Sequence, residues 1–350
     1  MSAFIRRTGL IGALSLSLGV AACQTPEAPP PPPPPPMPDL ALNSGVAEAA
    51  AVYLSYIGTS SSLSSSFSDG GQVRQSMLSA AAYEPVQLSR GMVAYAAIVA
   101  LQSPEFVNGV RSLAADPANR DTLFRQIVAD PAYAAQLPGA RQAAGLIASQ
   151  IQGTGNSMYA AGAAIKQTAY DIQRQRWSAQ HVTDREARLE QVRVLGTIPL
   201  NPDYTSSATL QQAGLSGHGL SLAPAEATPP YTQAVVRGLA LAALAALGQA
   251  GENNRPLTES LLNEPVSADC MNFTRLMILQ CLAASRPHYE EIFCLGQHLM
   301  MDTAQCIIDS GGSYTLSPVA ATALMASGQP TLEPAGSTTE GVSSEAQSPN

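Results

Sequence analysis

The chain has 350 residues, a formal net charge of −8 and a hydrophobic fraction of 45%. Loss of an N-terminal segment that carries Arg6 and Arg7 would change the net charge from −8 to −10, and Lys166 is the single lysine. Nucleic-acid binding relies on a basic surface that releases counterions, and docking on anionic lipid also relies on basic residues. The overall composition therefore argues against both and predicts a globular protein with one or two domains.

The first 23 residues have three consecutive parts. Arg6-Arg7 form a basic start, residues 10–19 are apolar, and Val20-Ala21-Ala22-Cys23 ends the segment. These parts are typical of a secretory signal over residues 1–22, and the apolar run is shorter than the about 20 residues of a spanning helix. The tetrapeptide resembles the lipobox of bacterial lipoproteins. The resemblance implies cleavage after Ala22, lipid on the Cys23 thiol and an acylated amine.

The residues after Cys23 indicate an address and a spacer. Gln24 stands where an aspartate would signal inner-membrane retention in some bacteria, so the resemblance favours an outer-membrane anchor with the body facing the periplasm or the cell surface. Two or three acyl chains make such an anchor stable. Pro29 to Pro36 form an unbroken run, which favours an extended polyproline helix of about 3.1 Å per residue. We therefore expect residues 23–43 to be a lipidated, proline-rich linker.

Residues 44–195 show helical periodicity and predict an alanine-rich, multi-helical domain of the all-α class. Three helix starts place a capping side chain before a proline, at Ser103, Asp116 and Asp130. A longer helix is expected from Asn156, and Thr183-Asp-Arg-Glu186 has the form of a capping box that begins a new helix. The arginines between residues 173 and 193 are expected to form a solvated face.

Composition divides the rest of the chain into three parts. Residues 196–231 are rich in Gly, Pro, Ser and Thr and predict a long loop. Residues 232–310 predict a second helical region, which could pack with residues 44–195 as one domain. Residues 311–350 are low in charge and rich in Ser, Thr, Pro and Ala, and we expect a disordered tail.

Four further cysteines lie in a predicted helical hairpin over residues 266–309 that turns at Ser285-Arg286-Pro287. An exported, oxidising address predicts two disulfides. Residues level with each other in an antiparallel hairpin have a constant sum of their numbers. The sum for Cys270 with Cys306 and the sum for Cys281 with Cys294 differ by only one. A bond within one helix is excluded, because two cysteines 11 residues apart on it are about 16 Å apart, too far to bond. We therefore predict nested Cys270–Cys306 and Cys281–Cys294 bonds, similar in principle to twin CX9C proteins but without kinship.

This pairing has one difficulty and one rival. At 100° per residue, Cys294 and Cys306 would lie about 120° apart on a straight α-helix, so either the helix bends at Gly296 or Cys306 lies where it frays. The rival is a zinc site, because Cys294 and His298 share a helix face, with His288 and Asp302 nearby. Without a CxxC pair, disulfides are the stronger interpretation, and no metal is predicted.

No catalytic motif is found among the four histidines of the chain. Ser216 and His218 lie in a Gly-rich loop that we interpret as a turn, and Glu290 and Glu291 would point about 100° apart on a helix. We therefore expect no enzyme activity and no cofactor besides the lipid on Cys23. The predicted function is a membrane-anchored envelope lipoprotein with a structural or protein-interaction role. The alternatives are an envelope protein that binds lipid or another hydrophobic ligand, and a hydrolase whose site is assembled from scattered helices.

Overall fold

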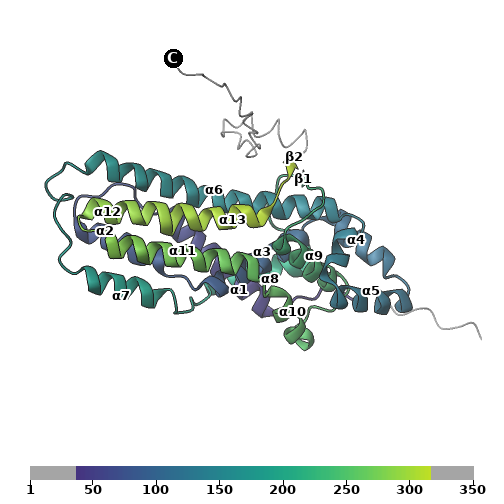
Figure 1. Ribbon diagram of the computed structural model, residues 1–350. Helices are drawn as coiled ribbons and strands as arrows, with labels where there is room; N and C mark the ends of the chain where they lie inside the picture. The colour runs from purple at the N-terminus through teal and green to yellow at the C-terminus, as the bar shows by residue number, and fades with distance from the viewer. Residues whose placement is uncertain (1–36, 317–350) are drawn as a thin grey trace, which may run out of the picture. The chain divides into compact units, whose positions relative to one another are not determined.

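The computed structural model describes residues 37–316, which belong to one compact unit (Figure 1). The predicted signal, the lipid-bearing Cys23, the proline run and residues 317–350 lie outside the described residues. Within 37–316 the chain is all-α, as predicted, apart from two strands of two residues each. The two predicted helical regions share one hydrophobic core. No helix among these residues is long and apolar enough to cross a membrane.

The first half contains six α-helices and one 3₁₀-helix. They are α1 (Ser44–Ser61), α2 (Gly70–Ala81), α3 (Pro85–Ala100), α4 (Pro104–Leu113), α5 (Pro117–Ala129), η1 (Pro131–Gln136) and α6 (Ala140–Ile172). The second half adds seven α-helices, a short 3₁₀-helix, a π-helix and the strands. They are α7 (Arg185–Leu195), α8 (Tyr204–Ser216), β1 (Ala225–Glu226), α9 (Gln233–Ala246), η2 (Glu252–Asn254), α10 (Arg255–Leu262), α11 (Pro265–Ala284), α12 (His288–Cys294), η3 (Leu295–Asp302), α13 (Thr303–Gly311) and β2 (Thr315–Leu316).

Two alanine-rich helices form the centre of the core. Almost every side chain of α3 and α9 is buried, and the two helices pack against each other. Small residues make this contact close, since a Cβ added to Gly238 would lie 2.7 Å from the Cβ of Ala96. On the other side of α3, Gly91 lies against the carbonyl of Ala49 on α1 in the same way. Glycines that face alanines therefore permit tight helix packing here.

The predicted helix starts at proline are confirmed. Ser103, Asp116 and Asp130 each accept a hydrogen bond from the first turn of α4, α5 and η1, respectively. The predicted capping box at 183–186 does not form, although a new helix does begin there. The N-cap residue of α7, Asp184, makes no capping bond. Its carboxylate pairs with Arg74 and Arg188 instead.

The long helix α6 lies beside the C-terminal hairpin. In Figure 1, α6, the α12–α13 segment, α11 and α7 lie side by side. Glycines bring α6 close to its neighbour: a Cβ on Gly162 would lie 2.5 Å from the Cβ of Met300, and one on Gly296 would lie 2.5 Å from the backbone nitrogen of Lys166. The predicted start of this helix at Asn156 is too late, since α6 begins at Ala140.

The nested disulfides are confirmed. Cys270 bonds to Cys306 and Cys281 to Cys294, each with a Cα–Cα distance of 5.8 Å. The expected offset of Cys306 is removed by the eight-residue π-helix η3. In a π-helix residue i bonds to residue i+5, so each residue turns the chain through less than the 100° of an α-helix. A difference of about 15° per residue over eight residues amounts to about 120°, which is the angle expected between Cys294 and Cys306 on a straight α-helix. Fraying is not the reason, because Cys306 is buried within α13.

The expected loop at 196–231 requires a correction, since it contains α8. Asp203 caps this helix by accepting from the Ser206 backbone, and Gly217 ends it in the left-handed conformation with φ of 69°. The buried side of α8 packs against α1 and α3. Tertiary packing and both caps stabilise a helix that its composition disfavours.

The two ends of the described segment are also ordered beyond expectation. Residues 313–316, predicted to belong to a disordered tail, end in β2, which pairs antiparallel with β1. At the other end, Leu42 is buried and forms a parallel bridge with Ala250. We call residues 41–43 the N-terminal seam. The Asn43 side chain helps to attach this segment to the helical body: its nitrogen donates to the Ala250 carbonyl at 3.0 Å and to the Thr258 hydroxyl at 2.8 Å.

Candidate functional site

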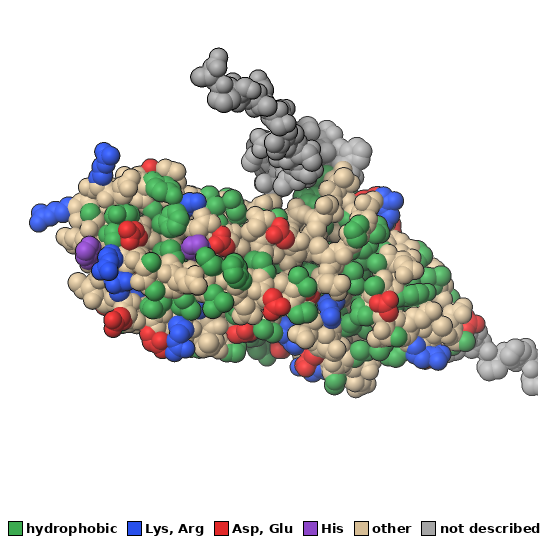
Figure 2. All heavy atoms as spheres, viewed as in Figure 1, with side chains coloured by type: hydrophobic (Ala, Val, Ile, Leu, Met, Phe, Trp, Pro, Cys, Tyr) green, Lys and Arg blue, Asp and Glu red, His purple; other side chains and the backbone are tan. Residues whose placement is uncertain are grey.

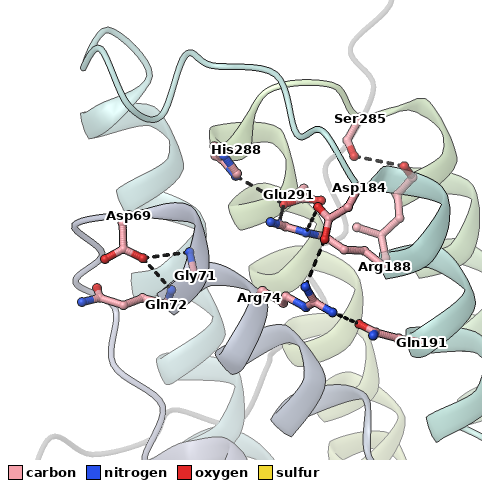
Figure 3. A network of polar contacts seen from close by, with 11 residues as sticks. Asp69, Gly71, Gln72, Arg74, Asp184, Arg188, Gln191, Ser285, His288 and Glu291 are labelled. Atoms are coloured by element: carbon pink, nitrogen blue, oxygen red, sulfur yellow. Dashed lines mark hydrogen bonds and ion pairs between the residues drawn. The ribbon is translucent and has the colours of Figure 1, made fainter.

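A partly buried polar cluster lies where α2, α7 and α12 meet (Figure 3). Arg188 on α7 pairs with Asp184 at 2.9 Å and with Glu291 on α12. From α2, Arg74 bonds to Asp184 at 3.0 Å and to Gln191 at 2.7 Å. The Arg188 and Glu291 side chains are 9% and 2% exposed, so this ion pair is removed from water. The cluster therefore joins α12 of the disulfide-bonded hairpin to α2 and α7 by charge.

The imidazole of His288 closes one side of the cluster. Its Nδ1 atom lies 3.6 Å from Glu291 and has no hydrogen-bond partner among the described residues. The ring packs flat on the chain at Gly70, where an added Cβ would lie 2.2 Å from the ring carbon Cε1. Trp177 packs on it with a centroid separation of 6.1 Å. Gly70 therefore makes room for His288.

Two pKa values in this cluster are shifted by burial. Burial raises the pKa of Glu291 to about 7, although Arg188 opposes the rise. Burial also lowers the pKa of His288, and the positive charge of Arg188 lowers it further. Glu291 thus takes up a proton near neutral pH, while His288 stays neutral. At 2% exposure the carboxyl of Glu291 is closed to substrate, so its chemistry is proton uptake linked to stability.

This cluster is not predicted from the sequence. The polar pattern predicts solvated arginines between residues 173 and 193, whereas Arg188 is buried. The angle between Glu290 and Glu291 on a helix does not tell which of them is buried. The available signal was the helix face: Glu291 lies three residues before Cys294 and four before Leu295, both buried, and Arg188 lies four before buried Val192.

A second polar group lies on η3. The Nδ1 atom of His298 is 2.7 Å from Asp302, and Gln297 donates to the same carboxylate at 2.7 Å. Although burial opposes the shift, these hydrogen bonds lower the pKa of Asp302. Cys294 of α12, another member of the zinc alternative, is bonded to Cys281. These residues are thus occupied by a disulfide and a local hydrogen-bond network.

Ser216 is the last residue of α8, and only Gly217 and His218 belong to the turn that the sequence predicts. The Ser216 hydroxyl donates to the His218 carbonyl at 2.7 Å, and the His218 Nδ1 atom lies 2.9 Å from the Ser216 carbonyl oxygen. Gly217 between them adopts a positive φ. The hydroxyl and the imidazole each bond to backbone and not to each other, so they form no nucleophile–base pair.

A groove with polar and aromatic walls lies beside the Cys281–Cys294 disulfide. It has a volume of about 430 Å³ and lies between α6, α11 and α12. Tyr170, Tyr289 and Phe293 give it aromatic walls. Tyr170 and Phe293 pack edge to face with centroids 6.1 Å apart. Its volume falls within the range of small-molecule sites.

The outward face of α11 carries large apolar side chains. Val266, Phe273 and Leu276 are 65%, 61% and 58% exposed. They are seven and three residues apart, so they lie on one side of the helix. Figure 2 shows hydrophobic side chains at the surface of the layer that contains α11. We call these three residues the α11 row.

Comparison with protein-family models, curated proteins and solved structures finds no match for this chain.

Proposed function

We propose that the chain is an exported lipoprotein, tethered to a membrane through Cys23, whose helical body binds a partner protein of the envelope through the α11 row. The row carries this proposal, because three large apolar side chains more than half exposed are costly in water unless a partner covers them. Their spacing matches the face of one helix, which favours a partner helix packed alongside α11.

The rigidity of α11 supports the same proposal. Cys270 and Cys281 on α11 bond to α13 and α12, respectively. On the buried side, Arg275 donates to the Ala81 carbonyl at 2.9 Å and to the Val192 carbonyl. A helix fixed on three sides presents its outward side chains in one arrangement, so little entropy is lost when they are covered. Two disulfides also agree with an oxidising compartment.

Site-specific photocrosslinking in intact cells tests the partner. A photoreactive phenylalanine analogue at Phe273 should give an adduct of defined mass, and the same analogue at Asn119, exposed on α5, should not. Phe273→Glu should abolish the adduct formed from a probe at Leu276. Equal labelling from positions 273 and 119, or none from 273 and 276, would contradict the proposal.

The tether is tested separately by Cys23→Ser. This variant should move from the membrane to the soluble fraction while its circular dichroism remains helical. Retention of the variant at the membrane after a carbonate wash would show that another part of the chain anchors it.

A second candidate is the binding of a hydrophobic ligand, and the groove beside Cys281 favours it. Its three aromatic side chains offer apolar area, and Glu290 and Gln173 give it a polar rim. Mass spectrometry of compounds that co-purify with Cys23→Ser tests this function. A stoichiometric ligand that is lost in Phe293→Ala would support ligand binding.

A further inference from the structure

We propose that four arginines at the C-terminal end of α6 form a surface that binds the phosphate headgroups of an anionic bilayer. This surface, the arginine end, consists of Arg174, Arg176, Arg185 and Arg286. They come from the connection that follows α6, from the start of α7, and from the turn between α11 and α12. In Figure 2, cationic side chains and a histidine gather on the side where α12 and α7 begin.

The backbone holds these segments together. Residues 178–182 bond to residues 286–289 through three backbone hydrogen bonds, including Val182 N–H to the Arg286 carbonyl at 2.8 Å. An antiparallel bridge between His181 and Pro287 lies in the same place. The Cys281–Cys294 disulfide closes the hairpin turn below it. The arginine end is thus one fixed surface built from three stretches of sequence.

The four guanidinium groups are free of ion pairs. None of them pairs with a carboxylate of residues 37–316, although six other arginines do. Arg174, Arg176 and Arg286 are exposed, and Arg185 donates to the Ala283 carbonyl at 2.6 Å. The nearby carboxylate of Glu290 accepts a hydrogen bond from the Arg286 backbone at 2.8 Å. The positive charge of these side chains remains available to an external anion.

The aromatic residues at this end favour a bilayer over a protein. Trp177, the single tryptophan of the chain, lies between the arginines and is partly exposed, and Tyr170 is 48% exposed. Tryptophan and tyrosine are the residues that prefer the membrane–water interface. Residues 171–190 expose no large aliphatic side chain, whereas the centre of a protein interface is apolar. Many phosphates presented together also suit four separate guanidinium groups better than one small anion does.

The acidic charge of the whole chain does not oppose this binding. At physiological ionic strength the Debye length is about 8 Å, whereas α6, with 33 residues, is about 50 Å long. Carboxylates near its start at Ala140 are therefore screened from a surface beyond Ile172. Within residues 173–182 there are two arginines and no acidic residue. The local charge, and not the net charge of −8, decides contact.

Vesicle binding tests the proposal on the full chain with Cys23→Ser, which removes the lipid so that the tether plays no part. The chain should bind vesicles of 30% phosphatidylglycerol in phosphatidylcholine, but not pure phosphatidylcholine, and binding should weaken as salt rises. Brominated phosphatidylglycerol should quench the fluorescence of Trp177. Each arginine near an anionic surface contributes about fivefold, so R174Q/R176Q/R286Q should weaken binding about a hundredfold.

A matched control keeps the change in net charge the same. R125Q/R141Q/R193Q removes three exposed arginines from α5, α6 and α7 and should leave vesicle binding within about twofold. Three results would overturn the proposal: no binding to anionic vesicles at low salt, equal weakening in both triple variants, or binding without quenching of Trp177. In the first case an acidic protein would be the occupant to test. If the triple variant does not fold, the test is the quenching of Trp177 by brominated phosphatidylglycerol in the chain that keeps all its arginines: quenching supports the proposal and its absence contradicts it.

Discussion

Arg188 on α7 forms a buried ion pair with Glu291 on α12, between two helices that are about 100 residues apart in the sequence. Arg188 also holds Asp184, so one guanidinium bonds to two carboxylates. Removal of two charges from water is costly, and the cost is offset only while each charge keeps its partner. The pair therefore makes the stability of this region depend on both residues and on pH.

Arg188→Ala should destabilise the protein by about 3 kcal/mol at pH 8, because it leaves Glu291 buried without a counter-charge. The loss should be smaller at pH 6, where Glu291 is neutral. Urea denaturation at the two pH values measures both free energies of unfolding. Arg193→Ala, which breaks an exposed pair with Glu190, is the control and should leave the denaturation midpoint unchanged. An equal loss at pH 6 and pH 8 would contradict the role given to Glu291.

Glu291→Gln should alter the pH dependence of stability. The folded protein holds a proton on Glu291 up to about pH 7, whereas the unfolded chain loses it near 4.5. Stability from this group is therefore complete below pH 4.5 and falls by about 3 kcal/mol as pH rises to 7. The melting temperature of the wild type minus that of Glu291→Gln should decrease between pH 5 and pH 8. His288 is present in both proteins, so its own titration largely cancels.

Gly296→Ala should destabilise the protein by about 2 kcal/mol, because its Cβ would lie 2.5 Å from the Lys166 backbone nitrogen and 2.8 Å from the Gly162 carbonyl oxygen. Gly153→Ala, also at a helical glycine, provides the opposite case. A Cβ at Gly153 meets nothing within 4 Å, so this variant should gain about 0.5–1 kcal/mol from helix propensity. Thermal unfolding of the two variants measures the difference in sign. A stable Gly296→Ala protein would show that α6 and η3 can separate.

The stability lost when a disulfide is removed should increase with the length of the loop that the disulfide closes. The Cys270–Cys306 bond spans 36 residues and the Cys281–Cys294 bond 13, so replacement by alanine pairs should cost about 4 and about 3 kcal/mol. The loss for all four cysteines should be less than the sum, because the smaller loop lies inside the larger one. Urea denaturation under non-reducing conditions measures the three values. An additive loss would mean that the two bonds constrain the unfolded chain independently.

Local patterns account for what the sequence predicts correctly. The capping residues before prolines, the hairpin turn and the nested disulfides depend on residues close together in the chain or level across one turn. The residue numbers of the two cysteine pairs have sums that differ by only one, and this is enough to predict the pairing. In contrast, the π-helix that brings Cys306 onto the face of Cys294 accompanies the packing of Gly296 against α6, more than 100 residues earlier.

The buried ion pair could not be predicted for a related reason. Arg188 lies in the most polar part of the chain, and it is removed from water because α7 packs on α2 and α11 and Glu291 of α12 meets its guanidinium. The helix α8 was missed because Ser, Thr and Gly have low helix propensity, although Asp203 and Gly217 mark its two ends. In both cases long-range contacts override the local composition.

The N-terminal seam has a mechanical consequence. Any pull on the chain ahead of Met37 reaches the helical body through Ala41 and Asn43, whose backbone N–H groups donate to the carbonyls of Ala245 and Ala250 at 3.1 and 2.8 Å. The Asn43 side chain adds two more bonds at the same point. These bonds share the force between two residues, Ala41 and Asn43, so the attachment of the linker resists extension before α1 begins to unwind. Under tension, Asn43→Ala should lower the force at which the first residues detach.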